Sequence, residues 1–145
     1  MDKVIVYTRA DGGVCVVMPT GEVPLEMVLS KDVPTDAISP RVVETADMPQ
    51  DYDFRNAWTQ DGDMVSVDMP KARAIHMDKI REARAPKLAE LDREWMKFTG
   101  QKNQKEADAI EEKRQKLRAL PQTVDLESAK TPEELKAIWP DELKE

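Results

Sequence analysis

The chain has 145 residues, enough for one well-packed core but too few for two. Charged residues make up 35% of the sequence and aromatic residues only 5%, so we expect part of the chain to be elongated. The net charge of −7 argues against nucleic acid as the main partner, because phosphate binding requires clustered Lys and Arg side chains.

The charge is unevenly distributed along the chain. Residues 1–69 contain five basic and thirteen acidic side chains, whereas residues 70–145 contain 17 and 16. A heavily charged but nearly neutral segment is typical of exposed helices with ion pairs between successive turns. We therefore predict an acidic β-rich module over residues 1–69, a helical hairpin over 70–120, and a tail with a short amphipathic helix over 121–145.

In the acidic half, β-branched and aromatic residues alternate with turn signals. Asp11-Gly12-Gly13 separates two apolar runs, and Asp61-Gly62 separates two more, so each pair of runs predicts a β-hairpin. Pro24 and Pro34 leave room for one short helical turn at Leu25–Leu29. The residues predicted to form strands are 4–8, 14–18, 41–44, 57–59 and 64–67.

A long helix is predicted to begin at Asp68, which can cap the free amides of the first turn, and to reach about Phe98. Pro86 lies inside this helix and predicts a kink, because proline removes a backbone hydrogen bond and crowds the preceding turn. The apolar stripe at three- and four-residue spacing consists of Met77, Ile80, Leu88, Leu91, Trp95 and Phe98.

Gly100 is predicted to end the long helix as a left-handed cap, and a second helix is predicted over residues 103–120, closed by Pro121. Two amphipathic helices joined by a short link should pack as an antiparallel hairpin. In the tail, Thr131 and Glu134 form a capping box with Pro132 at the first helical position. The predicted fold class is α+β: a small antiparallel β-rich module, a long kinked helix, a helical hairpin and a short C-terminal helix.

The inventory of catalytic residues is thin. His76 is the only histidine and lacks a neighbouring nucleophile motif, so a packing or surface role is favoured, and Cys15 lies in an apolar strand typical of unreactive thiols. Asp51 with Asp53, and Asp61 with Asp63, offer too few ligands for a calcium loop, and there is no glycine-rich phosphate loop. We predict a protein that is not an enzyme and that has no cofactor and no metal.

Features of membrane and secreted proteins are missing from the sequence. No stretch approaches the ~20 apolar residues of a membrane span, and a single cysteine permits no intrachain disulfide. The basic residues of the helical half alternate with acidic ones, which favours a solvated face over a nucleic-acid surface. We therefore expect a cytoplasmic protein with no membrane and no nucleic-acid partner.

The three tryptophans are informative about partner binding, because tryptophan is enriched in interfaces as well as in cores. Trp58 lies in a predicted strand and is expected in the core, while core and interface are equally favoured for Trp95. Trp139 lies in a helix too short to be stable alone, so it should dock either on its own chain or on a partner.

Several stretches of the sequence resemble a known group of proteins. Met48–Trp58 and Val67–Arg73 are similar to small proteins of tailed bacteriophages and prophages. The carboxy-terminal pattern resembles phage tail assembly chaperones and tail-fibre assembly proteins: an Arg-rich helix reaches Leu91-Asp92, and a second helix ends in Arg-x-x-Leu-Arg. The stretches that carry this resemblance are Ile80–Asp92, Arg114–Pro121 and Ile138–Pro140. The segment after Pro121 is longer than in that pattern, and the linker 101–106 is particular to this chain.

The resemblance implies a phage tail or tail-fibre accessory protein, either an assembly chaperone or a minor component of the virion tail. Its partner would be a tail or tail-fibre protein, with homo-oligomers as a further option. It would act in the bacterial host cytoplasm during assembly, and in the virion tail if retained. A prophage-encoded regulatory or host-interaction protein with a dimerising hairpin is the alternative. The residues expected to bind the partner are Arg81, Arg84, Leu88, Leu91, Trp95, Phe98 and Trp139.

Overall fold

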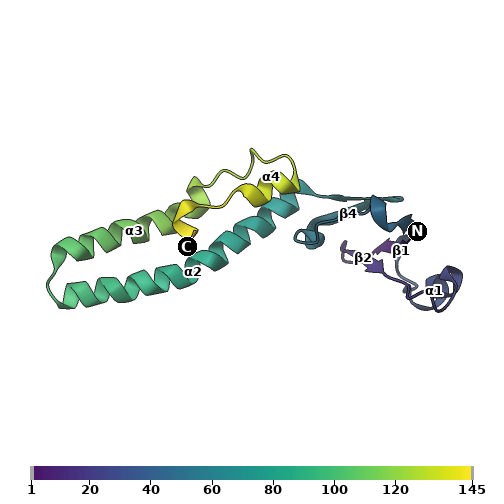
Figure 1. Ribbon diagram of the computed structural model, residues 1–145, viewed down its shortest axis with the longest axis horizontal. Helices are drawn as coiled ribbons and strands as arrows, with labels where there is room; N and C mark the ends of the chain where they lie inside the picture. Colours follow the sequence, from purple (N-terminus) through teal and green to yellow (C-terminus); the bar gives the residue numbers. More distant parts are fainter. Residues whose placement is uncertain (1, 145) are drawn as a thin grey trace. The chain divides into compact units, whose positions relative to one another are not determined.

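The computed structural model describes residues 2–144 and divides into two compact units, Met1–Ala72 and Arg73–Glu145. The first unit contains the strands and the second contains the long helices, so the chain is α+β as predicted. Figure 1 shows the order of the elements along the chain.

A three-stranded antiparallel sheet and a separate β-hairpin form the first unit. The sheet has the order β2-β1-β3, built from β1 (Lys3–Thr8), β2 (Val14–Val17) and β3 (Ile38–Glu44). The hairpin pairs β4 (Trp58–Asp61) with β5 (Met64–Val67). The short helix α1 (Leu25–Lys31) lies between β2 and β3 in the sequence, with Val28 buried.

Both faces of the sheet carry buried side chains, and a hydrophobic cluster covers one of them. Side chains alternate along β1, so Val4 and Val6 point to one face and Ile5 and Tyr7 to the other, and all four are buried. Trp58 is 3% exposed and joins the first face, which confirms its predicted core position. The residues of this cluster are Val4, Val6, Val43, Met48, Trp58 and Val65, with Val14, Val16 and Val67 packed against them.

Three single-turn 3-10 helices complete the description of the elements. η1 (Thr45–Asp47) and η2 (Arg55–Ala57) precede the β4–β5 hairpin, and η3 (Asp141–Leu143) lies near the carboxyl end. Ala57 belongs to η2 and not to the strand predicted to begin there, because its amide donates to the Phe54 carbonyl oxygen at 2.8 Å.

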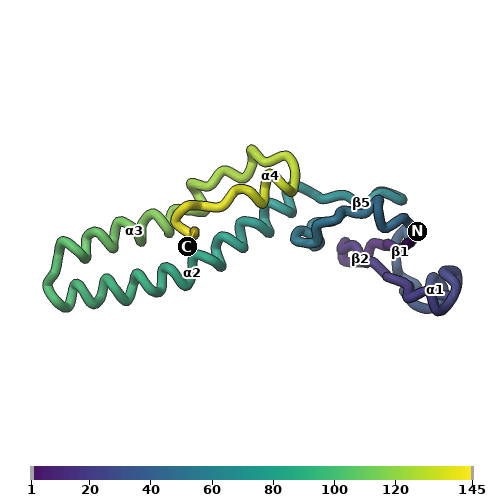
Figure 2. The backbone as a smooth tube through the Cα atoms, viewed as in Figure 1, coloured from purple at the N-terminus to yellow at the C-terminus, as the bar shows by residue number. Residues whose placement is uncertain are grey.

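The second unit consists of α2 (Met69–Gly100), which begins four residues before the unit, α3 (Gln104–Thr123) and α4 (Pro132–Ala137). The backbone turns at the end of α2, returns alongside it as α3, and then folds back again through α4 (Figure 2). Pro86 lies inside α2, which changes direction near its middle (Figure 1).

Two predicted helix ends were wrong. Gly100 is not the left-handed cap: it is still helical, and Lys102 has the positive φ of 59° that the turn requires. Pro121 does not close α3, which continues to Thr123. A proline inside a helix leaves one carbonyl oxygen without its amide donor, and here a side chain from α2 replaces that donor, as described below.

Candidate protein-binding site

Arg114 of α3 makes an ionic contact and an aromatic contact with α2. Across the hairpin, Arg114 Nε of α3 lies 2.7 Å from Asp92 Oδ1 of α2. Within α3, Arg114 Nη1 lies 2.5 Å from Glu111 Oε2. The guanidinium carbon lies 5.1 Å from the centroid of the Trp95 ring, and the Arg114 side chain is only 14% exposed. The Asp92 side chain is 48% exposed, so solvent screens this ion pair, and the contact of Arg114 with the Trp95 ring adds to the link between the helices.

Arg84 forms a second link between the helices. Its Nη1 donates to the carbonyl oxygens of Leu117 at 3.3 Å and Arg118 at 3.0 Å. The Leu117 carbonyl is the acceptor that the amide of residue 121 would normally occupy, and Pro121 has no amide hydrogen. The Arg84 guanidinium therefore supplies the missing donor, which explains why α3 continues past Pro121.

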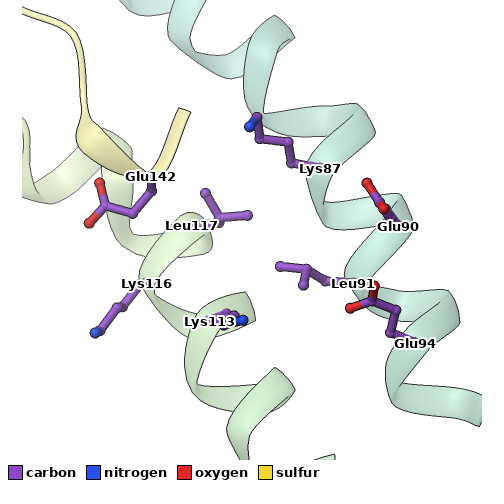
Figure 3. Close-up of a pocket in the computed structure, with 8 residues that line it drawn as sticks. All are labelled: Lys87, Glu90, Leu91, Glu94, Lys113, Lys116, Leu117 and Glu142. Atoms are coloured by element: carbon purple, nitrogen blue, oxygen red, sulfur yellow. The ribbon is translucent and has the colours of Figure 1, made fainter. Parts of the chain in front are cut away.

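A groove of about 500 Å³ runs between α2 and α3. In Figure 3, Leu91 of α2 and Leu117 of α3 point toward each other across it. Glu90 and Glu94 line the α2 side, and Lys113 and Lys116 line the α3 side. The remaining lining residues are Lys87 and Glu142. The groove therefore has apolar residues at its centre. Its α2 wall carries two carboxylates and the ammonium group of Lys87, and its α3 wall carries two ammonium groups.

The tail docks on the first half of α2 through polar contacts with its backbone. Arg73 donates to the carbonyl oxygens of Leu126 at 3.1 Å and Ala129 at 2.8 Å. His76 Nε2 lies 2.7 Å from the Ile138 carbonyl oxygen, so this nitrogen carries a proton. His76 is 4% exposed, which makes it a packing histidine.

Apolar contacts complete the docking of the tail. Leu135 is fully buried and Leu143 is 5% exposed. The Trp139 ring meets the His76 ring edge-on, with 5.9 Å between the centroids. Of the two options that the sequence left open for Trp139, the structure shows docking on its own chain.

The residues predicted to bind a partner fall into distinct places. Leu88, Leu91, Trp95 and Phe98 are half-buried along α2, and of these only Leu91 lines the groove. Arg81 is exposed and its Nη1 lies 3.0 Å from Asp78 Oδ1. Arg84 donates within the hairpin, and Trp139 is half-buried against His76. A contribution of these residues to partner binding stays a prediction.

Sequence reasoning missed the charged walls of the groove. Glu90 and Glu94 are four residues apart on α2, and Lys113 and Lys116 are three apart on α3, so each pair occupies one helical face. This spacing was a usable signal. It was obscured because acidic and basic residues occur throughout both helices, and only the packing of the hairpin separates those at the groove from those elsewhere.

Residues suited to chemistry are dispersed. Among residues 2–144, no three His, Cys, Asp or Glu side chains are grouped so that they could hold a metal ion. Cys15 is half-buried, and its side chain hydrogen-bonds to Tyr7, an interaction that together with burial raises the Tyr7 pKa above its ordinary value. None of the described helices is long and apolar enough to cross a membrane.

Comparisons with protein-family models, with curated proteins and with solved structures find no match for this chain.

Proposed function

We propose that this protein is a tail or tail-fibre accessory protein of a tailed bacteriophage, which binds a tail protein through the α2–α3 groove and catalyses no reaction. The observation that carries this proposal is the groove itself, with Leu91 and Leu117 at its centre, more carboxylates than ammonium groups on its α2 wall, and two ammonium groups on its α3 wall. The resemblance of Ile80–Asp92 and Arg114–Pro121 to tail assembly proteins supports the same role.

The charge pattern specifies the partner segment. An amphipathic helix fits an apolar groove between two helices, because its apolar face completes a three-helix cluster. Such a helix would need basic residues on the flank that faces Glu90 and Glu94, and acidic residues on the flank that faces Lys113 and Lys116. Opposed flanks of this kind fix the direction in which the partner helix binds and exclude the reverse orientation.

Charge reversal of one wall tests the proposal. Glu90→Lys combined with Glu94→Lys should abolish co-purification with the tail or tail-fibre protein of the phage that encodes the chain, because like charges then meet across the interface. The matched control is Glu82→Lys with Glu112→Lys, which makes the same charge change at exposed positions outside the groove. Co-purification that survives the wall reversal would refute the proposed site.

Leu91→Ala with Trp95→Ala should likewise abolish co-purification while the β-rich unit stays folded. Trp95 also contacts Arg114, so circular dichroism must show that the hairpin is retained. Met96→Ala serves as the control, because Met96 is 66% exposed on the same helix and does not line the groove.

The fate of the protein separates the two forms of the proposal. An assembly chaperone acting in the host cytoplasm should be absent from purified virions, whereas a tail component should be present at a defined copy number by mass spectrometry. A stable self-dimer in light scattering, disrupted by the wall reversal, would favour the regulatory alternative instead.

A further inference from the structure

In the part of the chain that the structure describes, one edge of strand β2 is unpaired. Arg9 N donates to the Gly13 carbonyl oxygen at 2.7 Å, so this pair closes the β1–β2 hairpin. Hydrogen-bonded pairs alternate along an antiparallel ladder, so the next ones are Tyr7 with Cys15 and Ile5 with Val17. The backbone N–H and C=O groups of Val14 and Val16 therefore point away from β1, along the free edge.

The opposite edge of the sheet is unsuited to pairing. On β3, the backbone groups of Val43 and Arg41 point toward β1 and pair with it. The backbone groups of Pro40 and Val42 therefore point to the outer edge of the sheet. Pro40 has no amide hydrogen, and Ser39 beside it has a positive φ of 51°. Proline and a local backbone irregularity are common protections of edge strands, and β2 has neither.

A groove of about 540 Å³ runs along β2. Its volume lies within the usual range of ligand sites. Val14, Val16 and Met18 line one side, and the segment that contains η2 lines the other. The residues contributed from the second side are Tyr52, Arg55, Asn56 and Trp58, and Arg9 and Gly13 complete the lining.

The polar groups of this groove are mainly hydrogen-bond donors. Arg55 is exposed and makes no ion pair with any residue from 2 to 144. Arg9 Nε lies 3.1 Å from Asp11 Oδ1, and its guanidinium folds over Gly13, where a Cβ atom would collide with it. The buried Trp58 Nε1 has no acceptor in the described part of the chain. Two of the five basic side chains of residues 1–69 thus line one groove.

We propose that the β2 edge and this groove bind an extended segment of another protein, added as a fourth strand and carrying a carboxylate that pairs with Arg55. Backbone hydrogen bonds to Val14 and Val16 supply affinity, and alternate side chains of the segment pack on Val16 and Met18. A second copy of the chain is a poorer occupant, because it would place two acidic units edge to edge. At physiological salt, the charges of the first unit that lie more than about 8 Å from the groove are screened. The arginines of the groove therefore decide its preference for a carboxylate on the bound segment.

The test uses fluorescence anisotropy of the full-length chain with a labelled short peptide of alternating threonine and valine and one central glutamate. Saturable binding is expected, together with slowed exchange of the Val14 and Val16 amides by NMR. Methylation of alternate peptide nitrogens should abolish binding, since it removes the donors of the added strand. A glutamine in place of the glutamate should weaken binding about tenfold, as expected for loss of a charge-assisted hydrogen bond.

Protein variants assign the contact. Arg55→Gln should weaken binding of the glutamate peptide about tenfold and leave binding of the glutamine peptide unchanged. Lys31→Gln makes the same charge change outside the groove and should alter the binding of neither peptide. No saturable binding, equal binding of the methylated peptide, or equal effects of the two variants would overturn the proposal. Self-association that the peptide displaces would show that a second copy occupies the edge, and would overturn it as well.

This groove shares no lining residue with the hairpin groove. Glu90→Lys with Glu94→Lys should therefore leave peptide binding unchanged, so the two proposals can fail independently.

Discussion

The Arg84 side chain of α2 compensates for a missing backbone hydrogen bond in α3. Pro121 deprives the Leu117 carbonyl of its usual donor, and Arg84 Nη1 replaces that donor at 3.3 Å while also reaching the Arg118 carbonyl. The guanidinium acts within the chain, and the expected contribution of Arg84 to partner binding stays a prediction. Long, always charged side chains with several donors are suited to such a role, because they can satisfy two acceptors at once.

The coupling of Arg84 to Pro121 is testable. Arg84→Gln should destabilise the chain by about 1–2 kcal/mol, because a partly buried carbonyl loses its donor. In a Pro121→Ala background the alanine amide can bond to the Leu117 carbonyl, so the same change should cost clearly less. Urea denaturation of the four proteins in this double-mutant cycle measures the difference. Equal costs in the two backgrounds would show that Arg84 does not replace the missing amide.

At the scale of elements, the helix ends are held by particular polar contacts. Asn103 Oδ1 accepts from the Glu106 amide at 3.3 Å at the start of α3, and Thr131 Oγ1 accepts from the Glu134 amide at 3.1 Å at the start of α4. Glu134 reaches back to the amide of Lys130, one residue before the expected position of a capping box. These contacts start the short helix, but Arg73 and His76 hold the tail on α2.

Removal of Arg73 should therefore release the tail. Arg73→Met loses the hydrogen bonds to the Leu126 and Ala129 carbonyl oxygens. This loss should lower the free energy of opening the tail by about 1.4 kcal/mol or more, which increases the open population at least tenfold. Trypsin cleavage after Lys130, followed by mass spectrometry, should accelerate accordingly. Arg81→Met is the control, since the only ion pair of Arg81 in the described chain is with Asp78. Similar cleavage rates in both variants would contradict this role of Arg73.

At the scale of the molecule, the chain has two compact units, each with its own buried residues. The first is built around Val6 and Trp58, and the second around Ile80 and Leu135. Compact units with separate cores can open as separate cooperative units.

Core truncations should thus act locally. Val6→Ala should remove about 2 kcal/mol from the unit that contains it, and Ile80→Ala about 2–4 kcal/mol from the other, because both side chains are fully buried. Hydrogen exchange of the full chain, read by mass spectrometry, should show faster exchange within residues 3–67 for the first variant and within 73–143 for the second. Faster exchange across both ranges in either variant would indicate a single cooperative unit.

The sequence by itself determined the fold class, the existence of the helical hairpin and the approximate positions of the strands, although β3 begins at Ile38 and not at the predicted Arg41. These follow from apolar periodicity, Asp-Gly turns and the Thr131 cap, which depend on residues close together in the chain. The same short range explains why Pro121 misled the prediction of a helix end: a propensity takes no account of Arg84, a donor 33 residues from the Leu117 carbonyl.

Only the tertiary structure decided which side chains face the α2–α3 groove, where Trp139 docks, and which edge of the sheet stays open. Each depends on contacts between distant parts of the chain. Glu90 resembles every other acidic residue of α2 until α3 packs beside it, and the Val14 and Val16 amides point away from β1 only because of the register in which the two strands pair. Side-chain charge is a property of the residue, but its partner is a property of the packing.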